Sequence, residues 1–244
     1  MDDEDPLYRQ VQRLLAGRIA AAEWAPGTAL PSETQLAKQM NISVSTVRAA
    51  VAELVAAQVL IRRQGKGTFI SPRDEDSSVY RFFHVFPDAG PRERPVSEIV
   101  SLLPDQASIA QAEVLGLGRT ADQRRVWRIT NVLKMADVPV QAAEIVLSRA
   151  RFPRLDARAL AEAAPTIYGS LQRLFGVTIV RTDDRLKAVR APPRIARLLR
   201  QPSGAPVLRI DRLARAIDGS PIEVRQSWIR ADTHHLFLRQ GGFD

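Results

Sequence analysis

Hydroxyl side chains and an arginine gather in one short segment of the chain, at Ser43, Ser45, Thr46 and Arg48. The residues after them, up to Leu54, are mainly small or apolar with helical spacing, so the segment is expected to begin a helix. A helix N-terminus presents unpaired N–H groups and the positive end of the helix dipole, which together attract phosphates. Short hydroxyls add donors there, and an arginine one turn in can reach a guanine edge or a phosphate. The segment therefore predicts contact with DNA, whereas a simpler interpretation makes Ser43 only an N-cap and Arg48 a solvated surface charge.

The elements around this helix help to decide between the two interpretations. Asp5 as an N-cap and Pro6 at the first helical position predict an earlier helix. Its apolar stripe is expected to consist of Val11, Leu14, Leu15, Ile19 and Ala22. Ser32 and Gln35 have the capping-box pattern, which opens a short helix up to about residue 40. Only a tight turn fits between that helix and the one capped by Ser43, whose expected core residues are Val47, Val51, Leu54 and Val55.

A basic hairpin follows the third helix. The segments "VLIRR" and "TFI" flank "QGKG", whose two glycines suit a tight turn between strands. Helix, helix, tight turn, helix and hairpin is the order of a winged helix-turn-helix, in which the third helix enters the major groove. Arg62, Arg63 and Lys66 lie on or beside the hairpin, and residues 6–72 carry eight lysines and arginines against three glutamates, a net charge of +5. This context favours the DNA interpretation of Arg48.

The pattern changes after residues 71–80, "SPRDEDSSVY", whose proline, serines and charges indicate a linker. Apolar runs and period-2 alternation predict strands at 81–86, 124–135, 138–147, 176–189, 205–217 and 220–230. Helices are expected around 105–115, 156–175 and 192–200, and turns at "ADVPV" and "IDGSP" imply antiparallel hairpins. We therefore expect an α+β chain with a DNA-binding domain at 1–71, a linker at 72–80 and a mixed or antiparallel-sheet domain at 81–244.

Composition bounds the function further. The formal net charge of +8 favours a polyanionic partner, and the absence of cysteine excludes disulfides, thiolate chemistry and cysteine-ligated zinc. No metal-site spacing of histidines, glycine-rich phosphate loop or nucleophile elbow is present, so we expect no catalytic residue, metal or cofactor. Asp183 and Asp184 are adjacent in an expected strand, so their side chains diverge and do not form a catalytic pair. The acidic N-terminus and the lack of a long apolar run predict a cytoplasmic protein without a membrane segment.

The segments "PLYRQVQRLLAGRI" and "PGTALPSETQLAKQMNISVSTVRAAVAELVAAQVLIRRQGKGTFI" closely resemble the DNA-binding domain of GntR-type transcriptional regulators. The resemblance implies a homodimer that binds a near-palindromic operator in double-stranded DNA, usually as a repressor. The residues expected at the DNA are Ser32, Thr34, Ser43, Val44, Ser45, Thr46, Arg48, Arg62, Arg63, Gln64, Gly65, Lys66 and Thr68. Thr34 and Val44 stand where many relatives have arginine, so a non-standard operator is expected.

The rest of the chain is similar to the effector-binding domain of the HutC branch, called UTRA, through "IYGSLQRLFGV", "APVLRIDRLA" and "DGSPIEVRQSWIRAD". That resemblance implies a chorismate-lyase-like sheet with helices that binds a small metabolite. The expected effector-contacting residues are Arg128, Asn131, Leu133, Glu144, Thr166, Tyr168, Arg212 and Glu223. Asn131 and Leu133 stand where sugar-phosphate-binding relatives have arginines, so a polar or carboxylated metabolite is expected instead. In the competing interpretation Tyr168 belongs to the core and Glu223 pairs with Arg225 or Arg212.

Two further functions compete with that of a metabolite-responsive regulator. A lyase-like enzyme in the second domain, tethered to DNA by the first, predicts turnover of a small acid by residues 80–244. An architectural DNA binder predicts no stabilisation by any metabolite, whereas a sensor gains stability from its ligand. The regulator is the interpretation that uses both resemblances.

Overall fold

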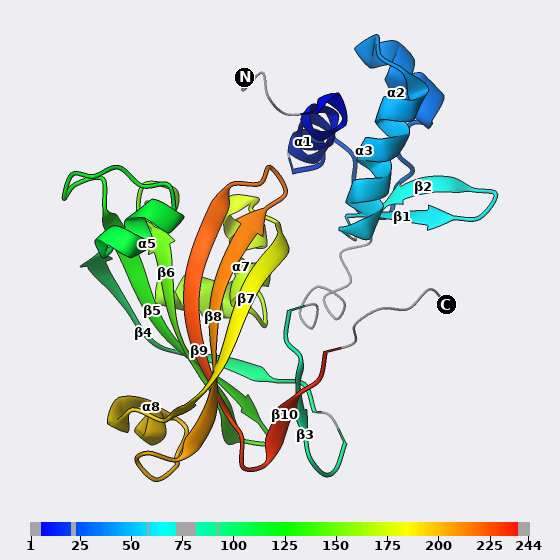
Figure 1. Ribbon diagram of the computed structural model, residues 1–244. Helices are drawn as coiled ribbons and strands as arrows, with labels where there is room; N and C mark the ends of the chain where they lie inside the picture. The colour runs from blue at the N-terminus through cyan, green and yellow to red at the C-terminus, as the bar shows by residue number, and fades with distance from the viewer. Residues whose placement is uncertain (1–5, 21–22, 58, 72–81, 92, 239–244) are drawn as a thin grey trace.

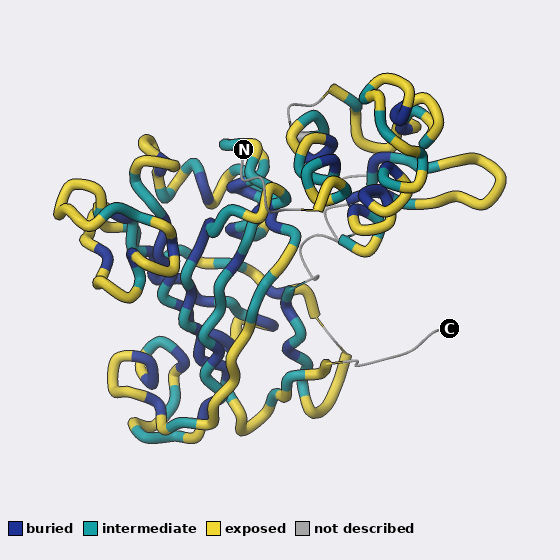
Figure 2. The backbone as a smooth tube through the Cα atoms, turned by 45° about the horizontal axis from the view of Figure 1, so that its top comes forward, coloured by how far each residue is buried: buried dark blue, intermediate teal, exposed yellow. Residues whose placement is uncertain are grey.

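The computed structural model describes residues 6–238 except 21–22, 58, 72–81 and 92 (Figure 1). The expected linker at 72–80, the cap at Asp5 and the last residue of the first apolar stripe, Ala22, lie outside the described residues. Helices and a short hairpin occupy the described residues up to 71, and a large sheet with helices occupies those from 82 onward. Each part has its own buried core (Figure 2).

The N-terminal elements follow the predicted order. Helices α1 (Leu7–Ala20), α2 (Glu33–Met40) and α3 (Val44–Ala56) precede an antiparallel hairpin of β1 (Leu60–Arg63) and β2 (Gly67–Ile70). Ser32 forms the predicted capping box with Gln35, and Asn41 ends α2 in the left-handed conformation, with φ 53°. Ser43 caps α3, so only residues 41–43 separate the two helices. A connection this short is typical of a helix-turn-helix.

A single apolar cluster holds these elements together. Leu15 of α1, Leu36 of α2 and Leu54 of α3 are fully buried in it. The expectation that Leu14 belongs to the buried stripe is wrong, because Leu14 is 51% exposed. Val11, Leu15 and Ile19 recur every four residues and form the packed face together with Ala16, which leaves Leu14 at its flank.

Six antiparallel strands form the sheet of the second part, in the order β4-β5-β6-β9-β8-β7. Their bounds are β4 (Val96–Gln106), β5 (Arg125–Met135), β6 (Val138–Ser148), β7 (Ile179–Arg190), β8 (Pro206–Ala216) and β9 (Pro221–Arg230). The turns predicted at 136–140 and 217–221 join β5 to β6 and β8 to β9. A separate two-stranded ribbon pairs β3 (Val85–Pro87) with β10 (His234–Leu236). The predicted α+β class is confirmed, and the large sheet is antiparallel.

Helices cover both faces of this sheet. On one face, α6 (Ala157–Ala163) and α7 (Ile167–Phe175) pack against Ile129 and Ile145. On the other, α5 (Ile109–Val114) packs against Val146 and α8 (Pro193–Leu198) against Val132. None of the helices in the described part of the chain has the length and apolarity needed to cross a membrane.

The alternation pattern misses β4 and misplaces three other elements. A helix beginning near 105 is wrong, because β4 continues to Gln106 and α5 starts only at Ile109. β4 contains Pro104 and lies at the sheet edge, where a missing N–H group leaves no ladder bond unmade. The helix expected at 156–175 is two helices, because Pro165 restricts Ala164 to extended backbone and Thr166 then caps α7. The strand expected at 81–86 is β3, which is shorter and later.

Candidate functional site

The N-terminus of α3 carries a cluster of three hydroxyl groups. Ser43 Oγ accepts a hydrogen bond from the Thr46 N–H group at 3.1 Å and lies 2.9 Å from Ser45 Oγ and 2.7 Å from Thr46 Oγ1. Ser43 and Ser45 are exposed, and Thr46 is half-buried. Ser43 is therefore an N-cap, as the simpler interpretation had it. The exposed hydroxyls nevertheless lie at the positive end of the helix dipole, where phosphate is favoured.

Glu33 of α2 forms ion pairs with both α3 and the β1–β2 hairpin. Its carboxylate accepts a hydrogen bond from Arg48 Nε of α3 at 2.8 Å and another from Arg62 Nη2 of β1 at 3.1 Å. Both arginine side chains remain at least half exposed, at 65% and 50%. The glutamate thus orients two cations from different elements on one surface. The sequence analysis included Glu33 only within the segment that resembles GntR-type regulators and missed this role.

The β1–β2 hairpin extends away from the core, and residues 62–67 are all exposed (Figure 2). Gly65 and Gly67 have φ values of 70° and 104°, which a side chain would disfavour. Arg63 lies over the Phe69 ring at 4.7 Å. Thr68 is half-buried, and its carbonyl group accepts a hydrogen bond from the Leu30 N–H group at 2.8 Å.

Not every residue expected at the DNA is equally available to it. Thr34 is exposed, as are Gln64 and Lys66. Ser32 is exposed but its hydroxyl serves the capping box. Val44 packs partly against the N-terminal core. The exposed polar side chains of this set are therefore concentrated on the first turn of α3 and on the hairpin.

Glu33→Gln is expected to lower the ratio of operator affinity to random-DNA affinity. The amide leaves Arg48 and Arg62 without their shared anion, so their orientation is lost while one net positive charge is gained. The slope of log affinity against log salt should steepen by up to about one unit. Titrations of both DNAs at several salt concentrations measure both effects.

Glu53→Gln is the matched control, because Glu53 is exposed on α3 and makes no ion pair with any described residue. Equal changes in the affinity ratio for the two variants would contradict the orienting role of Glu33.

A cavity of about 420 Å³ lies in the second part of the chain, beside the face of the sheet that carries α7. Strands β4 to β9, the segment 82–85, the start of α7 and the end of the described chain line it. Its polar lining residues are His84, Ser97, Asn131, Gln141, Thr166, Tyr168, Thr182, Asp184, Arg212, Arg225 and Ser227. This size is in the range of small-molecule sites.

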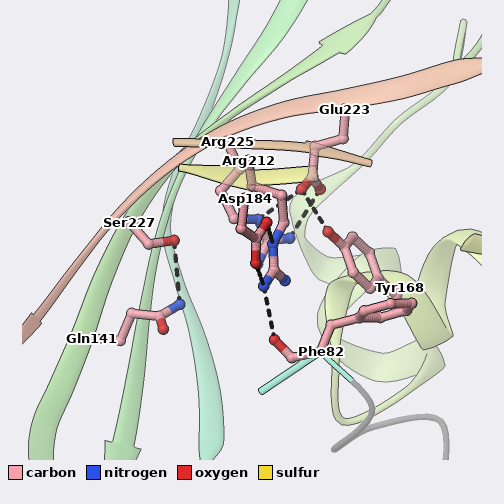
Figure 3. A network of polar contacts seen from close by, with 8 residues as sticks. All are labelled: Phe82, Gln141, Tyr168, Asp184, Arg212, Glu223, Arg225 and Ser227. Carbon is pink, nitrogen blue, oxygen red and sulfur yellow. Dashed lines mark hydrogen bonds and ion pairs between the residues drawn. The ribbon is translucent and has the colours of Figure 1, made fainter. Parts of the chain in front are cut away.

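Two ion pairs form the charged end of the cavity (Figure 3). Arg212 Nε and Nη2 donate to the two carboxylate oxygens of Asp184 at 2.8 and 2.6 Å. Arg225 Nε and Nη2 donate to the two oxygens of Glu223 at 2.7 and 2.9 Å. The Tyr168 hydroxyl donates to Glu223 Oε1 at 2.9 Å. Every charge in this cluster therefore has a partner of opposite sign.

Burial and charge set the protonation states in the cluster. Burial is the main factor that raises the pKa of Tyr168 above its ordinary value, and the charge of Glu223 adds to it, so the phenol stays neutral. Burial by itself lowers the pKa of Arg212, but the hydrogen bond and charge of Asp184 outweigh it and leave that pKa raised. Burial likewise lowers the pKa of Arg225, but the charge and hydrogen bond of Glu223 contribute to leaving it raised, so both arginines are cations at physiological pH.

Phe82 is the first described residue after the expected linker, and it is fixed to this cluster. Arg212 Nη2 donates a hydrogen bond to the Phe82 carbonyl oxygen at 3.0 Å. The Phe82 ring meets the Tyr168 ring edge to face, with centroids 5.8 Å apart. Phe82 thus lies against Tyr168 and Arg212 in the wall of the cavity (Figure 3).

A second set of polar side chains lies on the neighbouring strands β4, β5, β6 and β9. Asn131 Nδ2 donates to Ser97 Oγ at 2.8 Å and to the Glu98 carbonyl oxygen at 3.0 Å. Gln141 Nε2 lies 3.5 Å from Ser227 Oγ, at the limit of a hydrogen bond. These side chains carry no charge.

The structure brings most of the expected effector-contacting residues to this cavity. Asn131, Leu133, Thr166, Tyr168 and Arg212 line it. Glu223 is fully buried behind it and pairs with Arg225, as the competing interpretation allowed. The missed lining residues include Gln141, Asp184, Arg225 and Ser227, which approach one another only when four strands pair.

The expectation that Arg128 and Glu144 belong to the same site is corrected. Their side chains lie on the opposite sheet face, where Arg128 pairs with Asp105 and Glu144 with Arg194. The reason is the strand period of two, since Arg128 and Asn131 are three residues apart and so face opposite ways. The expected divergence of Asp183 and Asp184 is confirmed: Asp183 pairs with Arg181 and Arg215 instead of Arg212.

Comparisons with known proteins match both parts of the chain. Residues 92–235 match the family described as "UTRA domain", and residues 7–70 match "Bacterial regulatory proteins, gntR family". The chain belongs to the GntR family. It is similar to the HTH-type transcriptional regulator Rv0792c of Mycobacterium tuberculosis, at 30% identity over 90% of this chain and 80% of that one. It is also similar to the HTH-type transcriptional repressor NagR of Bacillus subtilis, at 28% identity over 94% and 92%.

A solved structure agrees with these matches. The ligand-binding domain of a GntR-family transcriptional regulator from Bordetella bronchiseptica superposes with a TM-score of 0.62 at 31% identity. It covers 66% of this chain and 99% of that domain. This GntR-family chain is a metabolite-responsive transcriptional regulator of the HutC type, and the matches are to regulators, which decides against a lyase.

Proposed function

We propose that this GntR-family regulator acts as a dimeric repressor in the cytoplasm, and that an effector in the cavity controls its affinity for a near-palindromic operator. The fixed position of Phe82 carries this proposal, because it joins the cavity wall to the chain that leads to the DNA-binding elements. A ligand that contacts Arg212 or Tyr168 alters the contacts of Phe82.

The DNA-contacting surface is the first turn of α3 together with the β1–β2 hairpin. In a dimer, two α3 helices would enter successive major grooves about one helical turn apart, ~34 Å. Arg48 would read bases, while the hydroxyls at Ser43 and Ser45 and the cations of the hairpin would hold phosphates. Val44 and Thr34 replace two arginines that many relatives carry, and neither can make the contacts of an arginine. This supports an operator that differs from theirs.

Binding of the effector and binding of the operator are coupled equilibria, because both take place on the same chain. Because coupling is reciprocal, an effector that weakens operator binding must itself bind more weakly to the DNA-bound protein. The Arg212–Phe82 contact gives this coupling a physical route, since it lies both in the cavity and at the start of the second domain.

Leu186→Trp is expected to abolish the response to the effector without weakening operator binding. Leu186 lines the cavity and is 43% exposed, so a larger side chain can enter the cavity without overpacking a closed core. The experiment screens metabolites for a rise in melting temperature and for release from the DNA upstream of the coding region. The variant should lose about tenfold or more in affinity for any active compound.

Leu103→Trp is the control, because Leu103 is 59% exposed on edge strand β4 and is not among the lining residues. An active compound that acts equally on both variants would place the effector outside this cavity.

A further inference from the structure

We propose that the cavity takes an uncharged molecule with hydroxyl or amide groups and an apolar part, and that it rejects carboxylates and phosphates. This inference rests on the proposal that the cavity is the effector site, and it narrows the expected polar or carboxylated metabolite to one class.

The first argument is charge balance. Arg212 and Arg225 are the two arginines in the cavity lining, and each has the Nε–Nη2 edge of its guanidinium occupied by a carboxylate of the protein through two hydrogen bonds. Strong recognition of a carboxylate or a phosphate uses a bidentate fork together with a net positive charge, and the protein carboxylates here cancel that charge. An anionic ligand would have to displace Asp184 or Glu223, or add an unbalanced negative charge to a cluster that is already neutral. Both routes bury a charge without a counterion.

The second argument is the presence of unused uncharged polar groups. Asn131 and Gln141 line the cavity and are only 1% and 6% exposed. The side-chain amide oxygen of each accepts no hydrogen bond from any described residue. Both oxygens belong to side chains that line the cavity. A buried carbonyl oxygen of this kind requires a donor, which a hydroxyl or an amide N–H supplies and a carboxylate or a dianionic phosphate does not.

The third argument is the apolar remainder of the lining. Phe83, Ile210, Ile229 and Leu236 line the cavity around the amide groups. An apolar portion of the ligand gains from burial against them, while the amides fix its orientation. The cavity therefore combines apolar walls, uncharged hydrogen-bonding groups and arginines that are already paired with carboxylates. These features match an uncharged ligand with polar groups and an apolar part.

The test compares two probes with the same skeleton, propionamide and propionate, in ligand-observed NMR with the full chain. Wild type should show saturation transfer to propionamide that Leu186→Trp removes, and no transfer to propionate above the level of that variant. Transfer to propionate that the variant removes would overturn the charge assignment and leave the cavity as a binding site. Absence of transfer to propionamide, or equal transfer in wild type and variant, would overturn this proposal. The effector proposal fails separately, if the metabolite response survives in Leu186→Trp.

A matched pair of variants removes one carboxylate each, only one of which is the partner of a cavity arginine. Asp184→Asn frees the Arg212 fork and should raise propionate affinity by roughly ten- to hundredfold, the gain from a hydrogen bond between charged groups. Asp183→Asn removes the same charge from the neighbouring residue on the opposite face, so its propionate affinity should equal that of wild type. Equal gains for both variants would mean that general charge, and not the paired arginine, governs anion binding.

Discussion

Arg48→Ala is expected to weaken operator binding by roughly 5- to 150-fold, the effect of losing one base contact worth about 1–3 kcal/mol. Binding to random DNA should fall only a few-fold, because the variant keeps the hydroxyls of the helix start and the cations of the hairpin. Arg48 lies one turn into α3, is 65% exposed and has its guanidinium oriented by Glu33. Fluorescence anisotropy with operator and scrambled duplexes at one salt concentration measures both affinities.

The control for this change is Arg158→Ala. Arg158 is an exposed arginine of α6 that pairs with Glu162, far along the chain from the DNA-binding elements. It removes the same charge and should leave both affinities unchanged. Equal fractional losses on operator and random DNA for Arg48→Ala would show that Arg48 contacts the phosphate backbone and reads no base.

The DNA-binding part was predictable because its signals are local. The Ser32 capping box, the Ser43 cap and the glycines of the hairpin each specify an element from residues two or three positions apart. Glu33 escaped prediction because its partners, Arg48 and Arg62, lie 15 and 29 residues away. Their meeting depends on how α2, α3 and β1 pack.

The effector cavity was only partly predictable for the same reason. Resemblance placed Thr166, Tyr168 and Glu223 at the site, but the pairing of Arg212 with Asp184 joins two different strands and was missed. No periodicity within one segment reveals such pairs, because strand order and register decide them. The misplacement of Arg128 and Glu144 was avoidable in part, since alternation already separates Arg128 from Asn131.

Glu223→Ala is expected to destabilise the second domain by about 3–5 kcal/mol, the cost of leaving a buried charge without its partner. Glu223 is fully buried and Arg225 is 8% exposed, so the remaining charge lacks the bulk solvent that would replace its lost partner. The Tyr168 hydroxyl loses its acceptor in the same step. Urea unfolding followed by tryptophan fluorescence reports on this domain through Trp127 and Trp228.

The double variant Glu223→Leu with Arg225→Met separates a buried charge from a general packing defect. Replacing a buried ion pair by apolar residues of similar volume is often neutral or stabilising, so the double variant should recover most of the stability that Glu223→Ala loses. Glu162→Ala breaks the exposed pair with Arg158 and should cause no measurable loss. A double variant as unstable as Glu223→Ala would mean that the shape of this pair, and not its charge balance, holds the wall of the cavity in place.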